Sequence, residues 1–118
     1  MNYSDKVREL VAQLPNSGTL ADATHEASAE NPICGDRITL LLRVENERVI
    51  DCRFSAEGCP AALAGAAGLT EIVRGMTIRE CAALRSENLL DHLGGLPAHK
   101  RHGADLAIDT LHSALATK

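Results

Sequence analysis

Two cysteines lie where the chain is expected to bend, which suits metal ligands and reactive thiols better than core residues. Cys34 lies in the segment Asn-Pro-Ile-Cys-Gly-Asp, and Cys59 lies in the segment Glu-Gly-Cys-Pro. Pro60 is well placed at the first position of a helix, so we expect Cys59 to be the N-cap of that helix. The unpaired N–H groups and partial positive charge of a helix N-terminus favour a thiolate, which is the form of cysteine that binds metal.

A carboxylate and an imidazole complete a candidate ligand set. Asp36 follows Cys34 by two residues, and His102 ends the run His-Lys-Arg-His before the last predicted helix. With Cys59 they offer two sulfurs, one oxygen and one nitrogen, a sensible four-coordinate set for zinc and a candidate set for an iron–sulfur cluster. The spacing alone is not specific, because the chain has no CxxC motif and buried inert cysteines are common.

The remaining cysteines and histidines are interpreted as structural. Cys52 falls on the apolar face of a predicted strand, which favours core packing. Cys81 lies three residues from both Ile78 and Leu84, so these side chains share one helix face and we expect partial burial. We interpret three other histidines as ordinary surface or helix residues, and the sequence suggests no partner for them: His25, His92 and His112.

Length and composition indicate one domain, residues 1–118, and exclude several classes of protein. Apolar residues make up 45% of the chain and aromatic residues only 2%, so the core must consist of Leu, Ile, Val and Ala. A net charge of −4 argues against nucleic-acid binding. No apolar run approaches the ~18 residues of a membrane span, and the N-terminus lacks a signal-peptide pattern. We therefore expect a cytoplasmic protein with reduced thiols and no disulfide scaffold.

Alternating side chains predict strands in the first half of the chain. Residues 36–44 and 50–55 alternate between apolar and polar side chains around a polar turn at residues 45–48. They predict an antiparallel hairpin with one buried face, to which Ile50, Cys52 and Phe54 contribute. Weaker alternation predicts a short edge strand near residues 24–28.

Helical periodicity predicts the remaining elements, and residues that begin or end helices set their boundaries. The region after Pro60 is rich in Ala and Gly, which allows close packing on the sheet. The predicted helix starts are an N-cap at Ser4, Pro60, a capping box at residues 77–80, an N-cap at Ser86, and His102. The predicted helix ends are residues 15–18, Gly75, residues 94–95 and a point shortly before Lys118.

With these motifs in order, the chain resembles the U-type iron–sulfur cluster assembly scaffolds, the IscU, SufU and NifU N-terminal family. The matching features are Asn-Pro-Ile-Cys-Gly-Asp, Gly-Cys after the hairpin, and Leu-Pro-Ala-His-Lys-Arg-His before the last helix. The resemblance covers nearly the whole chain, from Asn16 to Leu115. It implies an α+β fold, a small antiparallel sheet of about three strands with helices packed on one face, which agrees with the predicted elements.

The resemblance implies a protein that assembles a [2Fe–2S] cluster and is not an enzyme. Such scaffolds take sulfur from a cysteine desulfurase and pass the cluster to iron–sulfur acceptor proteins, some with a chaperone. The resemblance carries over four site residues: Cys34 and Cys59 as the first two cysteines, Asp36 as the aspartate and His102 as the histidine. The third cysteine of the family should directly follow the histidine, where this chain has Gly103. The chaperone-binding motif is also altered, at residues 96–100.

Three hypotheses follow for the function. The first is a scaffold-like protein that binds an iron–sulfur cluster, iron or zinc at Cys34, Asp36, Cys59 and His102, with zinc favoured in the purified protein by its tolerance of mixed ligands. The second is a sulfur-transfer protein in which Cys59 accepts persulfide from a cysteine desulfurase. The third is an interaction module that has kept the fold and lost the metal.

Overall fold

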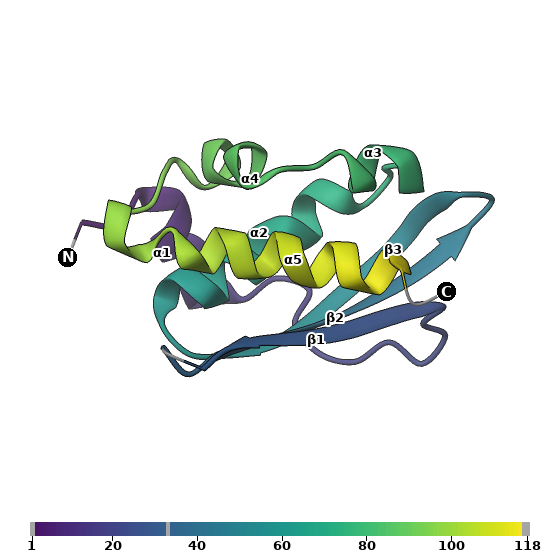
Figure 1. Ribbon diagram of the computed structural model, residues 1–118, viewed down its shortest axis with the longest axis horizontal. Helices are drawn as coiled ribbons and strands as arrows, with labels where there is room; N and C mark the ends of the chain where they lie inside the picture. The colour runs from purple at the N-terminus through teal and green to yellow at the C-terminus, as the bar shows by residue number, and fades with distance from the viewer. Residues whose placement is uncertain (1, 33, 117–118) are drawn as a thin grey trace.

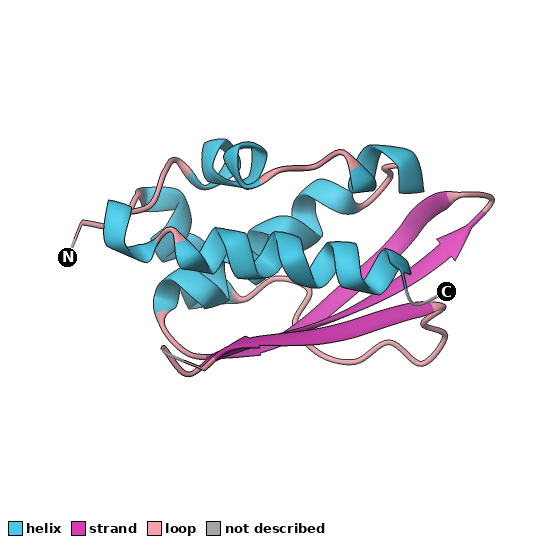
Figure 2. Cartoon of the chain, in the orientation of Figure 1, coloured by secondary structure: helices cyan, strands magenta, loops and turns pink. Residues whose placement is uncertain are grey.

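A sheet of three antiparallel strands forms one layer of the computed structural model, which describes residues 2–32 and 34–116. The strands lie in the order β1 (His25–Asn31), β2 (Asp36–Glu45) and β3 (Arg48–Glu57), so β2 is central. Helices cover one face of the sheet, as Figure 1 and Figure 2 show. The expected α+β architecture is confirmed.

The hairpin of β2 and β3 follows from a two-residue turn and from alternating side chains. Asn46 and Glu47 both have positive φ, at 52° and 64°, which gives a turn whose twist matches that of the flanking strands. The side chains that face the helices are buried: Ile38, Leu40, Leu42, Val49, Cys52 and Phe54. The predicted hairpin with one buried face is confirmed.

One residue of this hairpin does not follow the predicted alternation. Arg43 pairs with Asp51 while Val44 pairs with Val49, so Ile50 is the extra residue of a bulge. The bulge turns Ile50 outward, and its side chain is 43% exposed. The prediction that Ile50 lies on the buried face is therefore wrong.

Residues 14–24 carry the chain from one edge of the sheet to the other. The N–H of Gly18 donates to the carbonyl of Phe54 at 2.8 Å, and the N–H of Phe54 donates to the carbonyl of Asn16 at 3.1 Å, along the outer edge of β3. The chain then enters β1 on the opposite edge. The edge strand is longer than the predicted residues 24–28, because every residue from His25 to Asn31 pairs with β2.

Helices form the second layer, and most begin where the sequence predicts. Cys59 is the N-cap of the second helix with Pro60 at its first position, and Thr77 and Glu80 form the expected capping box. Ser4 caps the first helix by accepting a hydrogen bond from the N–H of Val7 at 3.0 Å. The bounds are α1 (Asp5–Gln13), α2 (Pro60–Val73), α3 (Ile78–Ala82), α4 (Ser86–Leu93), the 3-10 helix η1 (Ala98–Lys100) and α5 (His102–Ala116).

The predicted N-cap of α4 is wrong. Arg85 occupies the cap, and its N–H donates to the side-chain oxygen of Asn88 at 2.9 Å. Ser86 is the first residue of the helix, and its hydroxyl donates instead to Asp105 of α5 at 2.5 Å. The sequence predicted that the Ser86 hydroxyl caps α4, but this hydroxyl binds Asp105 of another helix instead.

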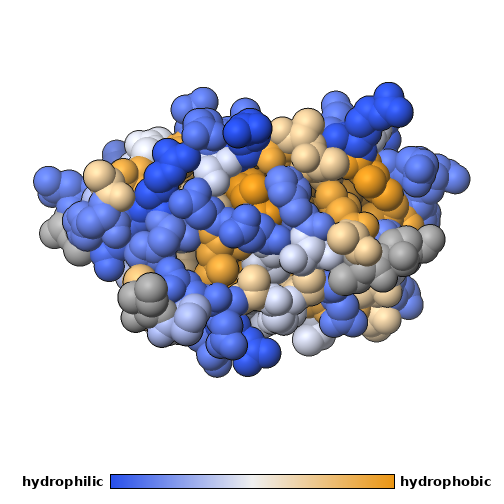
Figure 3. All heavy atoms as spheres, in the orientation of Figure 1, coloured by the Kyte–Doolittle hydropathy of each residue, from blue (hydrophilic) through white to orange (hydrophobic). Residues whose placement is uncertain are grey.

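The central helix, α2, packs against the sheet and against α1, α4 and α5. Its small residues at 61–62 and 64–68 are all buried, which allows these close contacts. The helix ends at Val73, slightly before the predicted Gly75, because Arg74 is extended. Polar residues cover most of the face seen in Figure 3, and apolar residues show as patches among them.

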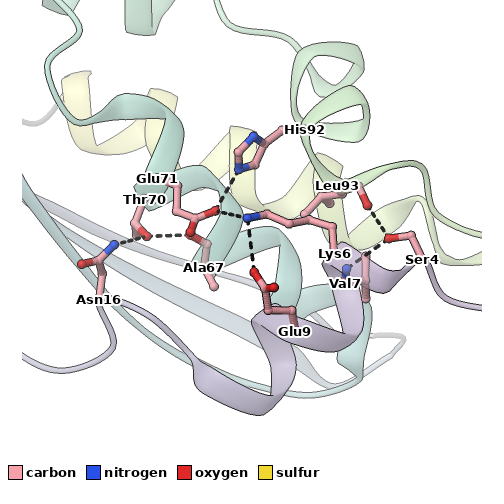
Figure 4. A network of polar contacts seen from close by, with 10 residues as sticks. All are labelled: Ser4, Lys6, Val7, Glu9, Asn16, Ala67, Thr70, Glu71, His92 and Leu93. Carbon is pink, nitrogen blue, oxygen red and sulfur yellow. Dashed lines mark hydrogen bonds and ion pairs between the residues drawn. The ribbon is translucent and has the colours of Figure 1, made fainter.

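A polar network joins α1, α2 and α4, as Figure 4 shows. Glu71 Oε1 lies 2.9 Å from His92 Nε2 and 3.1 Å from Lys6 Nζ. The sequence placed His92 on a helix but suggested no partner for it, and this contact was not predicted. The interpretation of His25 as an ordinary surface or helix residue is wrong, because His25 lies in β1, is buried, and has its Nδ1 2.8 Å from Thr24 Oγ1.

Candidate metal centre

The four residues singled out by the sequence come from three segments that meet at one end of the sheet. Cys34 is exposed in the turn between β1 and β2. Gly35 makes this turn tight, because its φ of 75° is in the left-handed region and its N–H donates to the carbonyl of Asn31 at 2.8 Å. Asp36 begins β2, Cys59 caps α2 and His102 begins α5.

Asp36 is the buried centre of the site, with 0% exposure. Its Oδ1 accepts a hydrogen bond from the N–H of Cys59 at 3.0 Å, so it satisfies a helix N-terminus that the Cys59 side chain leaves uncapped. Its Oδ2 lies 2.9 Å from His102 Nε2. Both carboxylate oxygens therefore have partners, as a buried carboxylate requires.

Gly58 permits this approach of β2 to the start of α2. Its φ is 134°, and a Cβ added there would lie 2.1 Å from Asp36 Oδ1 and 2.9 Å from Asp36 Cα. The sequence predicts Asp36 as a ligand but does not predict its hydrogen bond to the helix terminus. Glycine immediately before Cys59 is the signal from which this close approach could have been predicted.

The distances between the candidate ligand atoms fit a small metal ion. Cys59 Sγ lies 3.6 Å from His102 Nε2 and 3.7 Å from Asp36 Oδ2. Tetrahedral ligands at about 2.0–2.3 Å from zinc are about 3.3–3.8 Å apart, so these separations suit a shared ion. The ligand atoms of Cys34, Asp36 and His102 also lie within 4.8 Å of one another, in a group that does not include Cys59. A shared ion would require Asp36 and His102 to separate slightly from their 2.9 Å contact.

Comparison with known proteins identifies the family. Residues 2–117 match the family model described as NifU-like N terminal domain. The chain belongs to this family. It is 37% identical over 113 residues to "Iron-sulfur cluster assembly scaffold protein IscU 1" of Archaeoglobus fulgidus, over 96% of this chain and 74% of that protein. It is 36% identical over 115 residues to the protein named "Iron-sulfur cluster assembly scaffold protein IscU" of Aquifex aeolicus, over 96% and 73%.

Solved structures share the fold of this NifU-like domain. A protein described as a SUF-system scaffold from Fervidobacterium islandicum superposes with a TM-score of 0.82 at 20% identity, covering 96% of both chains. The N-terminal part of a NifU-like protein from Brucella abortus gives 0.81 at 18% identity, covering 96% of this chain and 91% of that one. The family resemblance drawn from the motifs is thus confirmed.

The two other cysteines of this NifU-like domain lie in the hydrophobic core and do not join the site. Cys52 and Cys81 are both fully buried, so Cys81 is more buried than predicted. Burial raises the pKa of the Cys52 thiol to about 12 and that of the Cys81 thiol to about 11. Neither thiol replaces the family's third cysteine, whose expected position holds Gly103.

A surface hollow of about 250 Å³ borders the site on the side where α5 faces β1. His102 lines it together with Glu30, Asp105 and Asp109. Cys34 is exposed and the His102 side chain is 22% exposed, so solvent reaches parts of these two residues although Asp36 is buried. Among the described residues, no helix is long and apolar enough to cross a membrane.

Proposed function

We propose that this protein is an iron–sulfur cluster assembly scaffold that holds its cluster, or the iron from which the cluster is built, on Cys34, Asp36, Cys59 and His102. One observation carries the proposal: side chains from β2, α2 and α5 converge around the buried Asp36, with Cys59 Sγ and His102 Nε2 3.6 Å apart. The names of relatives at 36–37% identity support it.

This set of ligand atoms suits a cluster that must later be released. Cluster iron is usually held by thiolates, and replacing two of them with a carboxylate and an imidazole weakens the hold on a cluster. The exposure of Cys34 leaves one sulfur accessible to an incoming partner. A [2Fe–2S] cluster needs four terminal ligands, which this site supplies without a third cysteine. Zinc accepts the same mixed set, and we propose it as the ion most readily retained on purification.

The scaffold role implies protein partners that supply sulfur and that receive the cluster. A cysteine desulfurase would supply sulfur, and iron–sulfur acceptor proteins would receive the cluster. We propose that the exchange takes place in the cytoplasm, that the protein acts by binding and not by catalysis, and that residues 1–118 act as one domain. A chaperone is a further candidate partner, at the altered motif of residues 96–100.

Anaerobic reconstitution tests the function. Purified protein is incubated with ferrous iron and sulfide, desalted, and analysed for iron, sulfide and visible absorption. The expected result is equal amounts of iron and sulfide with sulfur-to-iron charge-transfer bands, lost in Cys59→Ala and kept in Cys52→Ala. Protein that retains neither iron, sulfide nor zinc would refute the proposal. A separate incubation with a cysteine desulfurase and cysteine, which deliver sulfur already at the persulfide level, tests the sulfur-transfer hypothesis. Sulfur found by mass spectrometry on Cys34 or Cys59, without iron, would favour that hypothesis instead.

A further inference from the structure

The first turns of α2 and α5 touch backbone to backbone beside the site. The two helices run side by side in Figure 1. A Cβ added at Gly103 would lie 2.5 Å from both the carbonyl carbon and the carbonyl oxygen of Ala61. One turn further along α2, a Cβ added at Gly65 would lie 2.7 Å from the carbonyl oxygen of Gly103. Glycine at both positions is what allows the helices to approach this closely.

This contact lies between two of the proposed ligands. Gly103 directly follows His102 in α5, and Ala61 follows Cys59 by two residues in α2. We infer that Gly103 and Gly65 are positioning residues, whose backbone contact sets the 3.6 Å separation between Cys59 Sγ and His102 Nε2. The inference rests on the proposed function, because it concerns how the same site holds its metal.

The same contact explains the role of residue 103, where the family resemblance leads us to expect a third cysteine. A side chain at residue 103 would point at the backbone of Ala61 and not into the space between the ligand atoms. A cysteine there would therefore push α5 away from α2 before it could ligate. In this chain the position serves helix packing, and His102 serves as the ligand from α5.

The size of the expected displacement decides its effect. Carbon atoms in contact lie about 3.5–4.0 Å apart, so a methyl group at residue 103 requires the two helix starts to separate by roughly 1 Å. A ligand site tolerates misplacement of only about 0.5 Å. The retreat of α5 carries His102 with it, whereas Asp36 and Cys59 stay on β2 and α2.

Anaerobic titration with Co²⁺ tests this inference, because visible Co²⁺ absorption reports the number and type of ligands. We expect Gly103→Ala, Gly65→Ala and Gly103→Cys each to raise the Kd for Co²⁺ about 10- to 100-fold, as loss of ligand orientation does. Gly68→Ala is the matched control in the same helix. Its Cβ would meet Leu93 Cδ2 at 2.8 Å, the end of a flexible side chain, so stability changes while the Kd and the spectrum stay as in wild type.

A second measurement separates positioning from a general loss of structure. His102→Ala should raise the Kd in the wild-type background but have little further effect in Gly103→Ala, since His102 has already left the metal there. Circular dichroism of the metal-free variants shows whether each one folds. The double-variant comparison then reports on His102 alone, which a general effect on stability would not reproduce.

Three results would overturn the inference. Gly103→Ala could bind Co²⁺ like wild type, or Gly103→Cys could bind it more tightly than wild type. Both alanine variants could also lack a folded metal-free state, which would show that the glycines are required for folding and not for placing His102. If wild type itself binds neither Co²⁺, zinc nor iron, the proposed function fails, and this inference fails with it.

Discussion

The cysteines of the chain differ in exposure, and exposure influences the reactivity of a thiol. Cys34 is exposed, Cys59 is half-buried beside Asp36 and His102, and the other two thiols are in the core. A thiol reacts as its thiolate. Burial raises the pKa of Cys52 to about 12 and that of Cys81 to about 11, so both are almost entirely protonated at neutral pH.

Alkylation of the native, metal-free protein with iodoacetamide at pH 8 should therefore be selective. We expect Cys34 to react first, Cys59 more slowly, and Cys52 and Cys81 only after unfolding. Peptide mass spectrometry over a time course measures the four rates. Cys34→Ser should remove the fast phase, and protein unfolded in urea should react at all four thiols. Labelling of native Cys52 at the rate of Cys34 would contradict the burial described here.

At the scale of elements, the network in Figure 4 couples three helices through one carboxylate. Burial raises the pKa of the Glu71 carboxyl, but the hydrogen bonds from His92 and Lys6 outweigh it and hold that pKa below its ordinary value of 4.5. The unfolded state thus binds more protons than the folded state at and just below pH 4.5, so stability must fall as pH drops through this range.

We expect Glu71→Gln to flatten the acid dependence of stability. Wild type gains stability from the ionised Glu71 above pH 4.5 and loses it as pH falls through the lowered pKa, whereas the glutamine variant has no such proton to bind. Urea unfolding of metal-free protein between pH 3 and pH 6 measures the difference. Asp22→Asn, an exposed acid in a turn, is the control. Parallel curves for wild type and Glu71→Gln would refute the role given to this network.

Elements set by local rules were predictable from the sequence, and elements set by tertiary partners were not. The turn at Asn46 and the capping box at Thr77 depend on neighbouring residues, and both form as predicted. At the start of α4, Arg85 is the N-cap and the Ser86 hydroxyl donates to Asp105 of α5, a partner far away in the sequence. The outward turn of Ile50 depends on a bulge, which adds one residue to a pattern that alternation alone would continue.

The same distinction between local rules and tertiary contacts applies to the residues of the site. The sequence offered Cys34 and Cys59 at bends, and local rules placed Cys59 at the start of α2. The 2.9 Å contact between Asp36 and His102 joins residues far apart in sequence, and spacing could not predict it. Side-chain chemistry brought His102 into one candidate set with the others, and the family resemblance gave the same set. Neither could show that Gly103 packs against Ala61.

At the scale of the whole molecule, the site exists only when the chain is folded. Its proposed ligands come from β2, α2, α5 and the turn before β2, which unfolding separates. A metal that binds the folded state and not the unfolded state stabilises the protein by about 2.7 kcal/mol at a free concentration of 100 Kd. For a domain of this size that corresponds to a rise in Tm of roughly 10 °C. Metal-dependent stability is therefore a measure of site assembly that needs no partner protein.

Metal-dependent stability in two cysteine variants distinguishes a cysteine of the site from a cysteine of the core. Cys52→Ala should lower the stability of the metal-free protein by about 1 kcal/mol, because it leaves a small cavity in the core, yet keep the full rise in Tm with zinc. Cys59→Ala should lose that rise, because it removes a sulfur that lies within 3.7 Å of both Asp36 and His102. Thermal unfolding with and without zinc measures both effects. An equal rise in the two variants would mean that the metal is held elsewhere, since a core thiol and a ligand thiol cannot respond alike.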